Sequence, residues 1–470
     1  MLRMQGGAVT AQGAISYENL WHEGRWLRNA TVRVDASGNV ADVSTEVRGA
    51  TPPVSGLTLP GLVDAHCHAF QRALGAWTQR AAGTRDDFWS WRETMYALAG
   101  RLERDDLEAI TARCYLELLR GGYTSVAEFL YLHRLRGQRE LDADAGVAAA
   151  ARRTGMRLTL LPTLYQHSDF GGAPPKPGQQ PFARDANRFL EDWRELCRRY
   201  PAGGDVALGV AYHSLRAVDI DTISRVQASL QDDARCHCVH IHVAEQPAEV
   251  TGCLRQHGLP PVALLASRGL LSKKWALVHA TQSSEAEFAQ IHAAQATVVL
   301  CPTTEADLGD GCAVVAPFLE AGGQMAIGSD SNIGRSALDE LRQLEWSQRL
   351  ARGRRNVFSG AAESAVADRL FRIAHAGGHR AIGAASANAS AAAADFVTYD
   401  AQEGDWNLHS SPEYLSALVF DTVGPRARHV LVGGRWLIRD GIHPEESAIE
   451  ARYRETIKRL RPDILQWKTA

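Results

Sequence analysis

The chain has 470 residues, enough for one large α/β domain and a small accessory domain. Apolar residues make up 45% and charged residues 22%, which is ordinary for a globular enzyme. The formal net charge of −3 does not favour a nucleic-acid or anionic-membrane surface. No stretch approaches the ~20 apolar residues of a membrane helix, and the first residues lack the apolar region of a secretory signal. We therefore expect a cytoplasmic location and eight reduced cysteines.

Both ends of the chain are predicted to form short strands. Residues 14–60 contain strand-like runs separated by turns, ending in a segment rich in proline and glycine. Residues 394–400 and 426–441 again read as strands, the second range with a Gly-Gly turn at its centre. Residues 451–470 are predicted to form a C-terminal helix or tail.

The middle of the chain, residues 59–388, alternates apolar runs with segments of helical periodicity. Eight such runs lie at residues 61–66, 124–129, 157–164, 205–213, 237–243, 275–280, 296–301 and 324–330. Eight successive β-then-α units with nearly all-apolar strands are typical of a (β/α)8 barrel. An open, doubly wound sheet is the alternative. The long segment after the first run and the Pro/Gly stretch at 171–181 are predicted to be elaborated loops over the barrel mouth.

Polar residues follow the ends of four of these runs. His66 and His68 are separated by one residue, so on a strand both side chains face the same way. His242, His279 and Asp330 end the fifth, sixth and eighth runs. The carboxyl ends of barrel strands meet at one mouth, and imidazoles with a carboxylate suit zinc or a similar divalent metal. A single histidine in such a place is most often a core residue, but five residues at matching strand ends indicate a metal site.

This constellation resembles the amidohydrolase superfamily. The resemblance implies a distorted (β/α)8 TIM-type barrel, with a small β-sandwich domain built from residues 1–58 and 389–450. It also implies metal ligation by His66, His68, His242 and Asp330. Relatives with two metals carry a bridging lysine on the fourth strand, whereas none of the five lysines here lies in a predicted barrel strand. One Zn2+ per chain is therefore expected, with Fe2+ as the alternative.

Further segments narrow the resemblance to the N-formimidoyl-L-glutamate deiminase family of histidine degradation. They are HCHAFQRALG, FWSWRETMY, YTSVAEFLY, AYHSLRAV, HIHVAEQ, LVHAT, TEADLGDG and GSDS, and they span residues 66–331. The resemblance implies substrate contacts at Gln71, Arg92, Tyr131, His213 and Arg216. Two departures from the family pattern are the DAHCH sequence around the paired histidines and Asn332, which stands where relatives often have histidine.

The chemistry that this resemblance implies is hydrolytic deimination of a small substrate with two carboxylates. Arginine recognises carboxylates through a planar fork of donors, which favours Arg92 and Arg216 as the carboxylate contacts over the nearby Arg72 and Arg335. Zinc would activate the attacking water, with Asp330 beside it. Glu245, in the H-x-x-E motif that begins at His242, and His279 would divide the acid and base roles. The sequence does not fix that division.

Other readings of the sequence remain open. Another single-zinc deaminase would act on a purine-like or triazine ring, although two arginines at the mouth are not needed for a neutral ring. A metal-free homologue would serve as a binding protein, and a metal assay would identify it. A homodimer is retained as an expectation for assembly.

Overall fold

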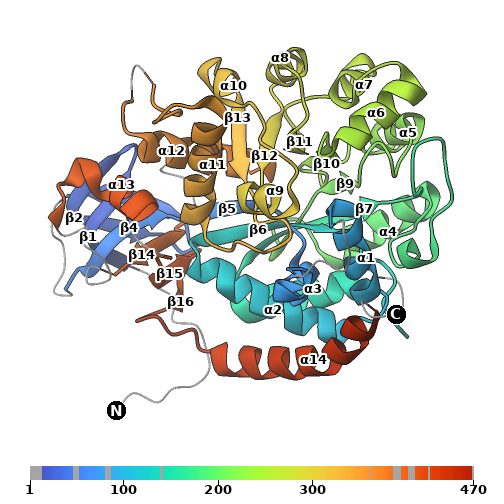
Figure 1. Ribbon diagram of the computed structural model, residues 1–470. Helices are drawn as coiled ribbons and strands as arrows, with labels where there is room; N and C mark the ends of the chain where they lie inside the picture. The colour runs from blue at the N-terminus through green and yellow to red at the C-terminus, as the bar shows by residue number, and fades with distance from the viewer. Residues whose placement is uncertain are drawn as a thin grey trace.

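The computed structural model describes residues 13–45, 52–79, 86–137, 141–360, 363–384, 393–400, 408–421 and 424–467. A barrel of parallel strands ringed by helices lies beside a smaller β-sheet, and the C-terminal helix runs along the barrel's outer side (Figure 1). The predicted domain boundary between residues 388 and 389 lies outside the described residues. The remaining boundaries stay predictions.

Strands from both ends of the chain form the smaller sheet, as expected. They are β1 (Gly13–His22), β2 (Arg25–Val34), β3 (Val40–Ser44), β4 (Val54–Pro60), β14 (Phe396–Tyr399), β15 (Ala427–Val432) and β16 (Arg435–Ile438). They make one continuous seven-stranded sheet in the order β16-β15-β14-β4-β1-β2-β3. The turn between β1 and β2 places Glu23 and Gly24 at φ of 50° and 80°, as a type I′ hairpin requires. β14 pairs with β4, and this pairing joins the two ends of the chain.

The barrel strands coincide with the eight predicted apolar runs. They are β5 (Leu62–Cys67), β6 (Tyr123–Leu130), β7 (Arg157–Leu164), β8 (Val206–Leu208) with β9 (Val210–Tyr212), β10 (Val239–Val243), β11 (Trp275–His279), β12 (Thr297–Leu300) and β13 (Gln324–Ile327). Their pairings are parallel and their residues are almost all buried. The predicted barrel is confirmed, and continuous apolar strands follow from burial on both faces.

The fourth barrel position is split and the barrel closes through a short contact. Between β8 and β9 a Cβ on Gly209 would lie 2.5 Å from the sulfur of Cys238, so glycine allows the close approach of β10. Closure comes from backbone hydrogen bonds between the first and last strands. The amide of Asp330 donates to the carbonyl of His66 at 2.9 Å, and the amide of His68 donates to the carbonyl of Asp330 at 3.0 Å.

Helices cover the outside of the barrel. They are α2 (Arg104–Arg120), α3 (Asp142–Thr154), α4 (Ala186–Arg199), α5 (Ile220–Leu230), α6 (Pro247–His257), α7 (Pro261–Ser267), α8 (Glu285–Ala293), α9 (Pro302–Leu308), α10 (Ala316–Glu320), α11 (Ala337–Arg352) and α12 (Val366–Ala381). α4 shows the amphipathic pattern of a helix that packs against a barrel. Its buried residues Phe189, Trp193 and Leu196 recur at helical spacing and form one apolar face. The long loop after β5 contains α1 (Phe88–Ala99).

The C-terminal helix α14 (Glu446–Trp467) crosses the outer face of α2. Ion pairs join the two helices, among them Arg113 with Glu450 at 2.7 Å and Arg452 with Glu108 at 3.0 Å. α13 (Tyr414–Ser416) is a single short turn. In the described part of the chain, none of the helices combines the length and apolar character that a membrane span needs.

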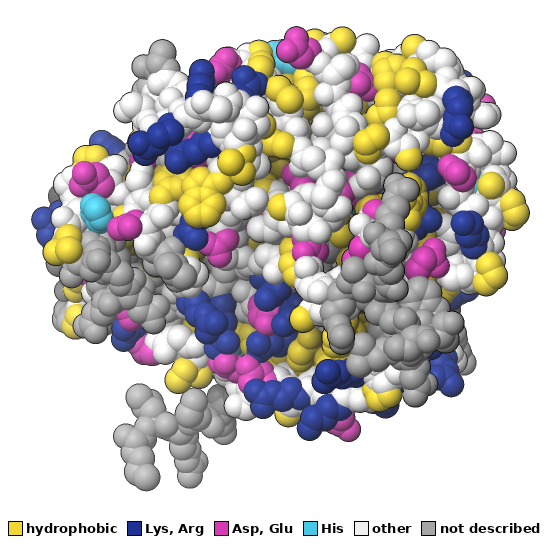
Figure 2. Space-filling view, viewed as in Figure 1, with side chains coloured by type: hydrophobic (Ala, Val, Ile, Leu, Met, Phe, Trp, Pro, Cys, Tyr) yellow, Lys and Arg dark blue, Asp and Glu magenta, His cyan; other side chains and the backbone are white. Residues whose placement is uncertain are grey.

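Acidic and basic side chains are interspersed over the face of the molecule in Figure 2, with apolar side chains between them. This mixture agrees with the small net charge. The eight cysteines are free thiols, and six of them are buried, as expected for reduced side chains that pack in the interior.

Candidate metal and substrate site

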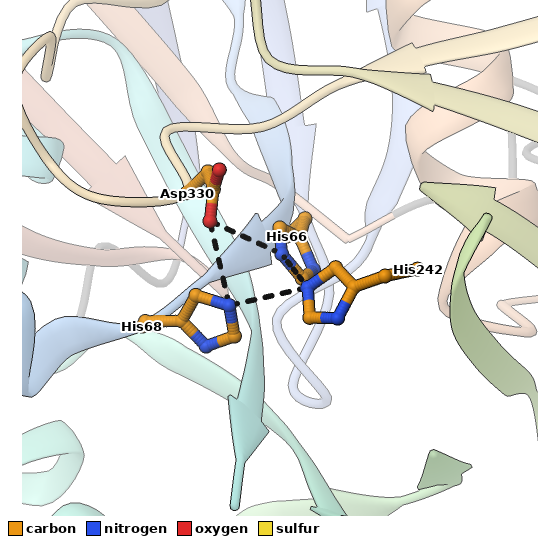
Figure 3. A group of neighbouring side chains, drawn as sticks. All are labelled: His66, His68, His242 and Asp330. Carbon is orange, nitrogen blue, oxygen red and sulfur yellow. Dashed lines mark hydrogen bonds and ion pairs between the residues drawn. The ribbon is translucent and has the colours of Figure 1, made fainter. Parts of the chain in front are cut away.

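Three imidazoles and one carboxylate meet at the carboxyl ends of the barrel strands. His66 and His68 lie at the end of β5, His242 lies on β10, and Asp330 follows β13. Nε2 of His66 lies 3.1 Å from Nε2 of His242 and 3.3 Å from Oδ1 of Asp330. Nε2 of His68 lies 3.3 Å from Nε2 of His242 and 3.4 Å from Oδ1 of Asp330. Figure 3 shows the four side chains turned toward one common point.

Backbone carbonyls fix the orientation of two of these rings. Nδ1 of His68 donates to the carbonyl of Phe129 at 2.9 Å, and Nδ1 of His242 donates to the carbonyl of His213 at 2.8 Å. Burial lowers the pKa of His68 to about 3 and the pKa of His242 well below its ordinary value. Both rings are therefore neutral, with the proton on Nδ1 and a lone pair on the inward-facing Nε2.

This donor set fits a divalent cation. The Nε2 lone pairs of His68 and His242 face each other with no proton to share, and a carboxylate oxygen of Asp330 stands beside them. Such groups repel one another unless a cation lies between them. Three imidazole nitrogens and one carboxylate oxygen are ligands that zinc and related divalent metals accept. The chain therefore has a metal-binding group, and these residues together with His66 would hold the ion.

A second, smaller cluster of donor atoms lies beside the first. It comprises His279, Cys301 and Asp330, and it shares Asp330 with the first cluster. Burial raises the pKa of the Cys301 thiol well above its ordinary value, so the thiol stays protonated and is a poor ligand. The split fourth strand, β8 and β9, contains no lysine that could bridge two ions. Among the described residues, the group of His66, His68, His242 and Asp330 is the larger of the two donor clusters.

Beside the metal-binding group, His279 is surrounded by carboxylates. Its Nε2 lies 3.8 Å from Oε1 of Glu245 and 3.9 Å from Oδ2 of Asp330, and its Nδ1 lies 3.4 Å from Oε1 of Glu305. Burial acts to lower the pKa of His279, but Glu245, Glu305 and Asp330 outweigh it and raise the pKa to about 10. Burial raises the pKa of Glu245. The arrangement gives neighbouring groups that can hold or transfer a proton.

The backbone is strained at two of these residues, His279 and Asp330, and this conformation sets the direction of their side chains. His279 and Asp330 have φ of 74° and 47°, and Ala280 has φ of 50°, all in the left-handed region that non-glycine residues seldom adopt. Each such residue costs about 1–3 kcal/mol unless its surroundings hold it. A hydrogen bond from the amide of Ala280 to the carbonyl of Val243 at 2.9 Å holds the first turn, and the barrel-closing bonds hold Asp330.

The residues predicted to contact substrate line one pocket that opens over the metal-binding group. They are Gln71, Arg92, Tyr131, His213 and Arg216, and they lie together with His68, His242, Glu245, His279 and Asp330. Nε2 of Gln71 donates to the Tyr131 hydroxyl at 2.8 Å, while Oε1 of Gln71 is buried without a hydrogen-bond partner. Nε of Arg92 and Nε of Arg216 are likewise buried without one. The pocket thus contains polar atoms available to a ligand.

Two nearby arginines play a different part. Arg72 and Arg335 both form ion pairs with Glu117, through Nε at 2.5 Å and 3.0 Å respectively. Asn332, one of the two departures from the family pattern, holds the backbone of the site in place. Its Nδ2 donates to the carbonyls of His68 and Asp330 at 3.1 Å and 2.9 Å. It therefore fixes the backbone of two proposed metal ligands.

Sequence reasoning did not identify three carboxylates around His279 and Glu245. Glu305 contacts His279 and is itself held by the amide of Cys301 at 2.9 Å. Oε2 of Glu249 accepts from the amide of Glu245 at 3.0 Å. Asp310 accepts from Gln246. Glu305 and Asp310 belong to the TEADLGDG segment, whose acidic residues are the available signal in the sequence.

Comparison with known proteins agrees with this geometry. The family model described as "Amidohydrolase family" matches residues 57–437. Formimidoylglutamate deiminase from Pseudomonas aeruginosa is 37% identical over 427 residues, which cover 90% of this chain and 93% of that protein. The 8-oxoguanine deaminase from the same organism is 28% identical over 86% of this chain and 87% of that protein.

A crystal structure of an amidohydrolase from Brucella melitensis has the same fold. It superposes with a TM-score of 0.87 at 35% identity and covers 96% of this chain and 100% of that chain. The family match and these relatives span the barrel and most of the smaller sheet. The chain belongs to the amidohydrolase family and is a hydrolase of carbon–nitrogen bonds.

Proposed function

We propose that the chain converts N-formimidoyl-L-glutamate and water to N-formyl-L-glutamate and ammonia, a step of histidine degradation, with one zinc ion per chain. The pair of arginines in the pocket carries this proposal. Within the described residues, neither Arg92 nor Arg216 forms an ion pair, and both stand over the metal-binding group. Two guanidinium forks match a substrate with two carboxylates. The relative named formimidoylglutamate deiminase supports the same substrate.

The metal ligands in this proposal are His66, His68, His242 and Asp330. Zinc is favoured over iron because three imidazoles and one carboxylate are a common zinc donor set. When bound, zinc supplies a Lewis acid that brings the pKa of water towards ~7. The remaining steps depend on what the side chains of the chain bind and where they hold protons.

Substrate orientation comes from the arginines. Arg92 on α1 and Arg216 in the loop after β9 bind the carboxylates of the glutamate half, and Gln71, Tyr131 and His213 offer polar contacts between them and the metal-binding group. The formimidoyl carbon then lies at the end of the pocket where Glu245 and His279 stand. The reacting groups are thereby held in place before reaction.

The proton transfers follow from that placement. A water oxygen attacks the formimidoyl carbon, and the new tetrahedral carbon carries two nitrogens. Asp330 accepts in turn the two protons that the water oxygen loses, and they replace the two protons that Glu245 delivers to the unsubstituted nitrogen, while the protonated His279 stabilises the oxygen as it becomes negative. The bond from carbon to that nitrogen breaks, ammonia leaves, and the C=O bond of the formyl group forms. The close approach of Glu245, His279 and Asp330 supports this sequence.

Which C–N bond breaks depends on which nitrogen receives the proton. The arginines hold the carboxylates, so the substituted nitrogen lies on their side of the pocket. The unsubstituted nitrogen faces Glu245 and His279. We therefore expect ammonia and N-formylglutamate as products. Release of glutamate and formamide would require the proton to reach the other nitrogen.

The decisive experiment measures ammonia release across formimidoyl amino acids and purines, followed by product NMR. Ammonia with N-formylglutamate supports the proposal, while formamide with glutamate overturns the direction of cleavage. A purine-like substrate is the second candidate, favoured by the similarity to 8-oxoguanine deaminase. Turnover of purines with no turnover of formimidoylglutamate would establish that candidate instead.

A further inference from the structure

Two arginine side chains in the pocket converge on a single indole ring. Trp89 and Arg92 lie three residues apart near the start of α1, so they occupy the same face of that helix. The guanidinium carbon of Arg92 lies 4.5 Å from the centre of the Trp89 ring. The guanidinium carbon of Arg216, in the loop after β9, lies 5.6 Å from a ring of the same residue. Trp89 thus links two otherwise separate elements of the site.

The contacts with Trp89 offset the repulsion between the two arginines. Two like charges that stand close together repel, and within the described residues neither Arg92 nor Arg216 has a carboxylate partner in an ion pair. Nε of each is buried and without a hydrogen bond. The face of an indole ring carries negative electrostatic potential, which attracts a guanidinium group without using its N–H donors. The donors therefore remain available for a ligand.

We propose that Trp89 is a positioning residue that holds Arg92 and Arg216 in the geometry that binds two carboxylates. This inference rests on the proposed function for the identity of the substrate. The two arginines depend on Trp89 to different degrees, because Arg92 also lies over the ring of Tyr96 at 5.3 Å. For Arg216, Trp89 is the one aromatic ring within cation–π distance among the described residues. Arg216 is therefore the more dependent of the two.

The test compares Trp89→Leu with Trp89→Phe in the metal-loaded full-length protein. Trp89→Leu removes the aromatic face and should raise KM for formimidoylglutamate by about 5- to 50-fold, since it weakens two cation–π contacts. kcat should change by less than about threefold, because the reacting groups are untouched. Trp89→Phe keeps an aromatic face and should restore most of the affinity. Binding of glutarate, a plain dicarboxylate, should weaken in parallel by calorimetry.

A matched control is Trp436→Leu. Trp436 on β16 is also partly buried and stacks on an arginine, Arg439, at 5.5 Å, but it lies in the smaller sheet. Its removal should leave KM and glutarate binding unchanged. This control separates the loss of any tryptophan–arginine contact from the loss of the contact in the pocket.

A double-mutant cycle with Arg216→Met tests whether Trp89 acts through that arginine. If it does, Trp89→Leu costs much less affinity in the Arg216→Met background than in the parent. Unchanged KM and glutarate binding in Trp89→Leu, equal damage in Trp89→Phe, or full additivity in the cycle would each overturn the inference. Failure of the parent protein to deiminate formimidoylglutamate, with glutarate binding still weakened by Trp89→Leu, would reject the proposed function and leave the role of Trp89 standing.

Discussion

Replacing Glu245 by glutamine is the sharpest test of the proposed proton transfers. The substitution keeps the shape of the side chain but removes its ability to ionise and so to deliver a proton. Oε1 of Glu245 lies 3.8 Å from Nε2 of His279. At an effective dielectric constant of ~20, a pair of unit charges at that distance interacts by about 4 kcal/mol. The change therefore acts both on Glu245 and on the charge state of His279.

The expected loss of rate follows from these contacts. Glu305 and Asp330 remain beside His279 in the variant, so part of the electrostatic interaction survives. Loss of a positioned proton carrier typically costs about 10²- to 10⁴-fold in rate. We expect kcat to fall by at least ~10²-fold, which corresponds to about 2.7 kcal/mol of barrier. KM should change little, because Glu245 is not one of the carboxylate contacts.

The assay is steady-state ammonia release, with metal content and thermal unfolding measured on the same samples. Glu287→Gln is the matched control, since Glu287 is a buried carboxyl on α8, away from the pocket, whose contact with the amide of Val262 at 3.0 Å a glutamine oxygen can preserve. Its kcat should stay within about threefold of the parent. A folded, fully metallated Glu245→Gln protein with near-normal kcat would show that Glu245 carries no proton in the reaction.

Three further predictions concern recognition, metal and acid stability. Arg92→Met and Arg216→Met should each lower kcat/KM by about 10- to 150-fold, mainly through KM, since each removes a charged hydrogen bond; parent-like kinetics in both would reject the arginine contacts. Elemental analysis should find one divalent ion per chain, and His242→Ala should lose it; two tightly bound ions or full retention would contradict the ligand set. Burial holds the pKa of His133 well below its ordinary 6.5, so the unfolded chain binds that proton more readily and stability falls as the pH drops below about 6.5. In His133→Gln the glutamine amide can still donate to the carbonyl of Thr163. Denaturant titrations between pH 7.5 and 5 should show that the free energy of unfolding of this variant falls less steeply with decreasing pH, by up to about 1.4 kcal/mol per pH unit. The same pH dependence in the variant and the parent would refute this.

The sequence by itself determined the barrel and the metal-binding group. All eight apolar runs became barrel strands, because a strand buried on both faces must be apolar along its length. Polar residues from different strands come together at the carboxyl ends of those strands. His66, His68, His242 and Asp330 lie at those ends, and the parallel arrangement of barrel strands brings any such residues to one mouth.

Tertiary structure alone decided how the loop and helix side chains around that site contact one another. The sequence offered no means to see that Trp89 contacts both arginines, that Glu305 contacts His279, or that Glu117 pairs with Arg72. Side chains alternate between the two faces of a barrel strand, and all the barrel strands run in one direction. The sequence pattern of a strand therefore predicts where its side chains point. The loops have no such period, and their contacts depend on how each loop packs on the finished barrel. The spacing of residues along the chain therefore encodes the metal-binding group, whereas the contacts among the loop side chains around it appear only when the chain is folded.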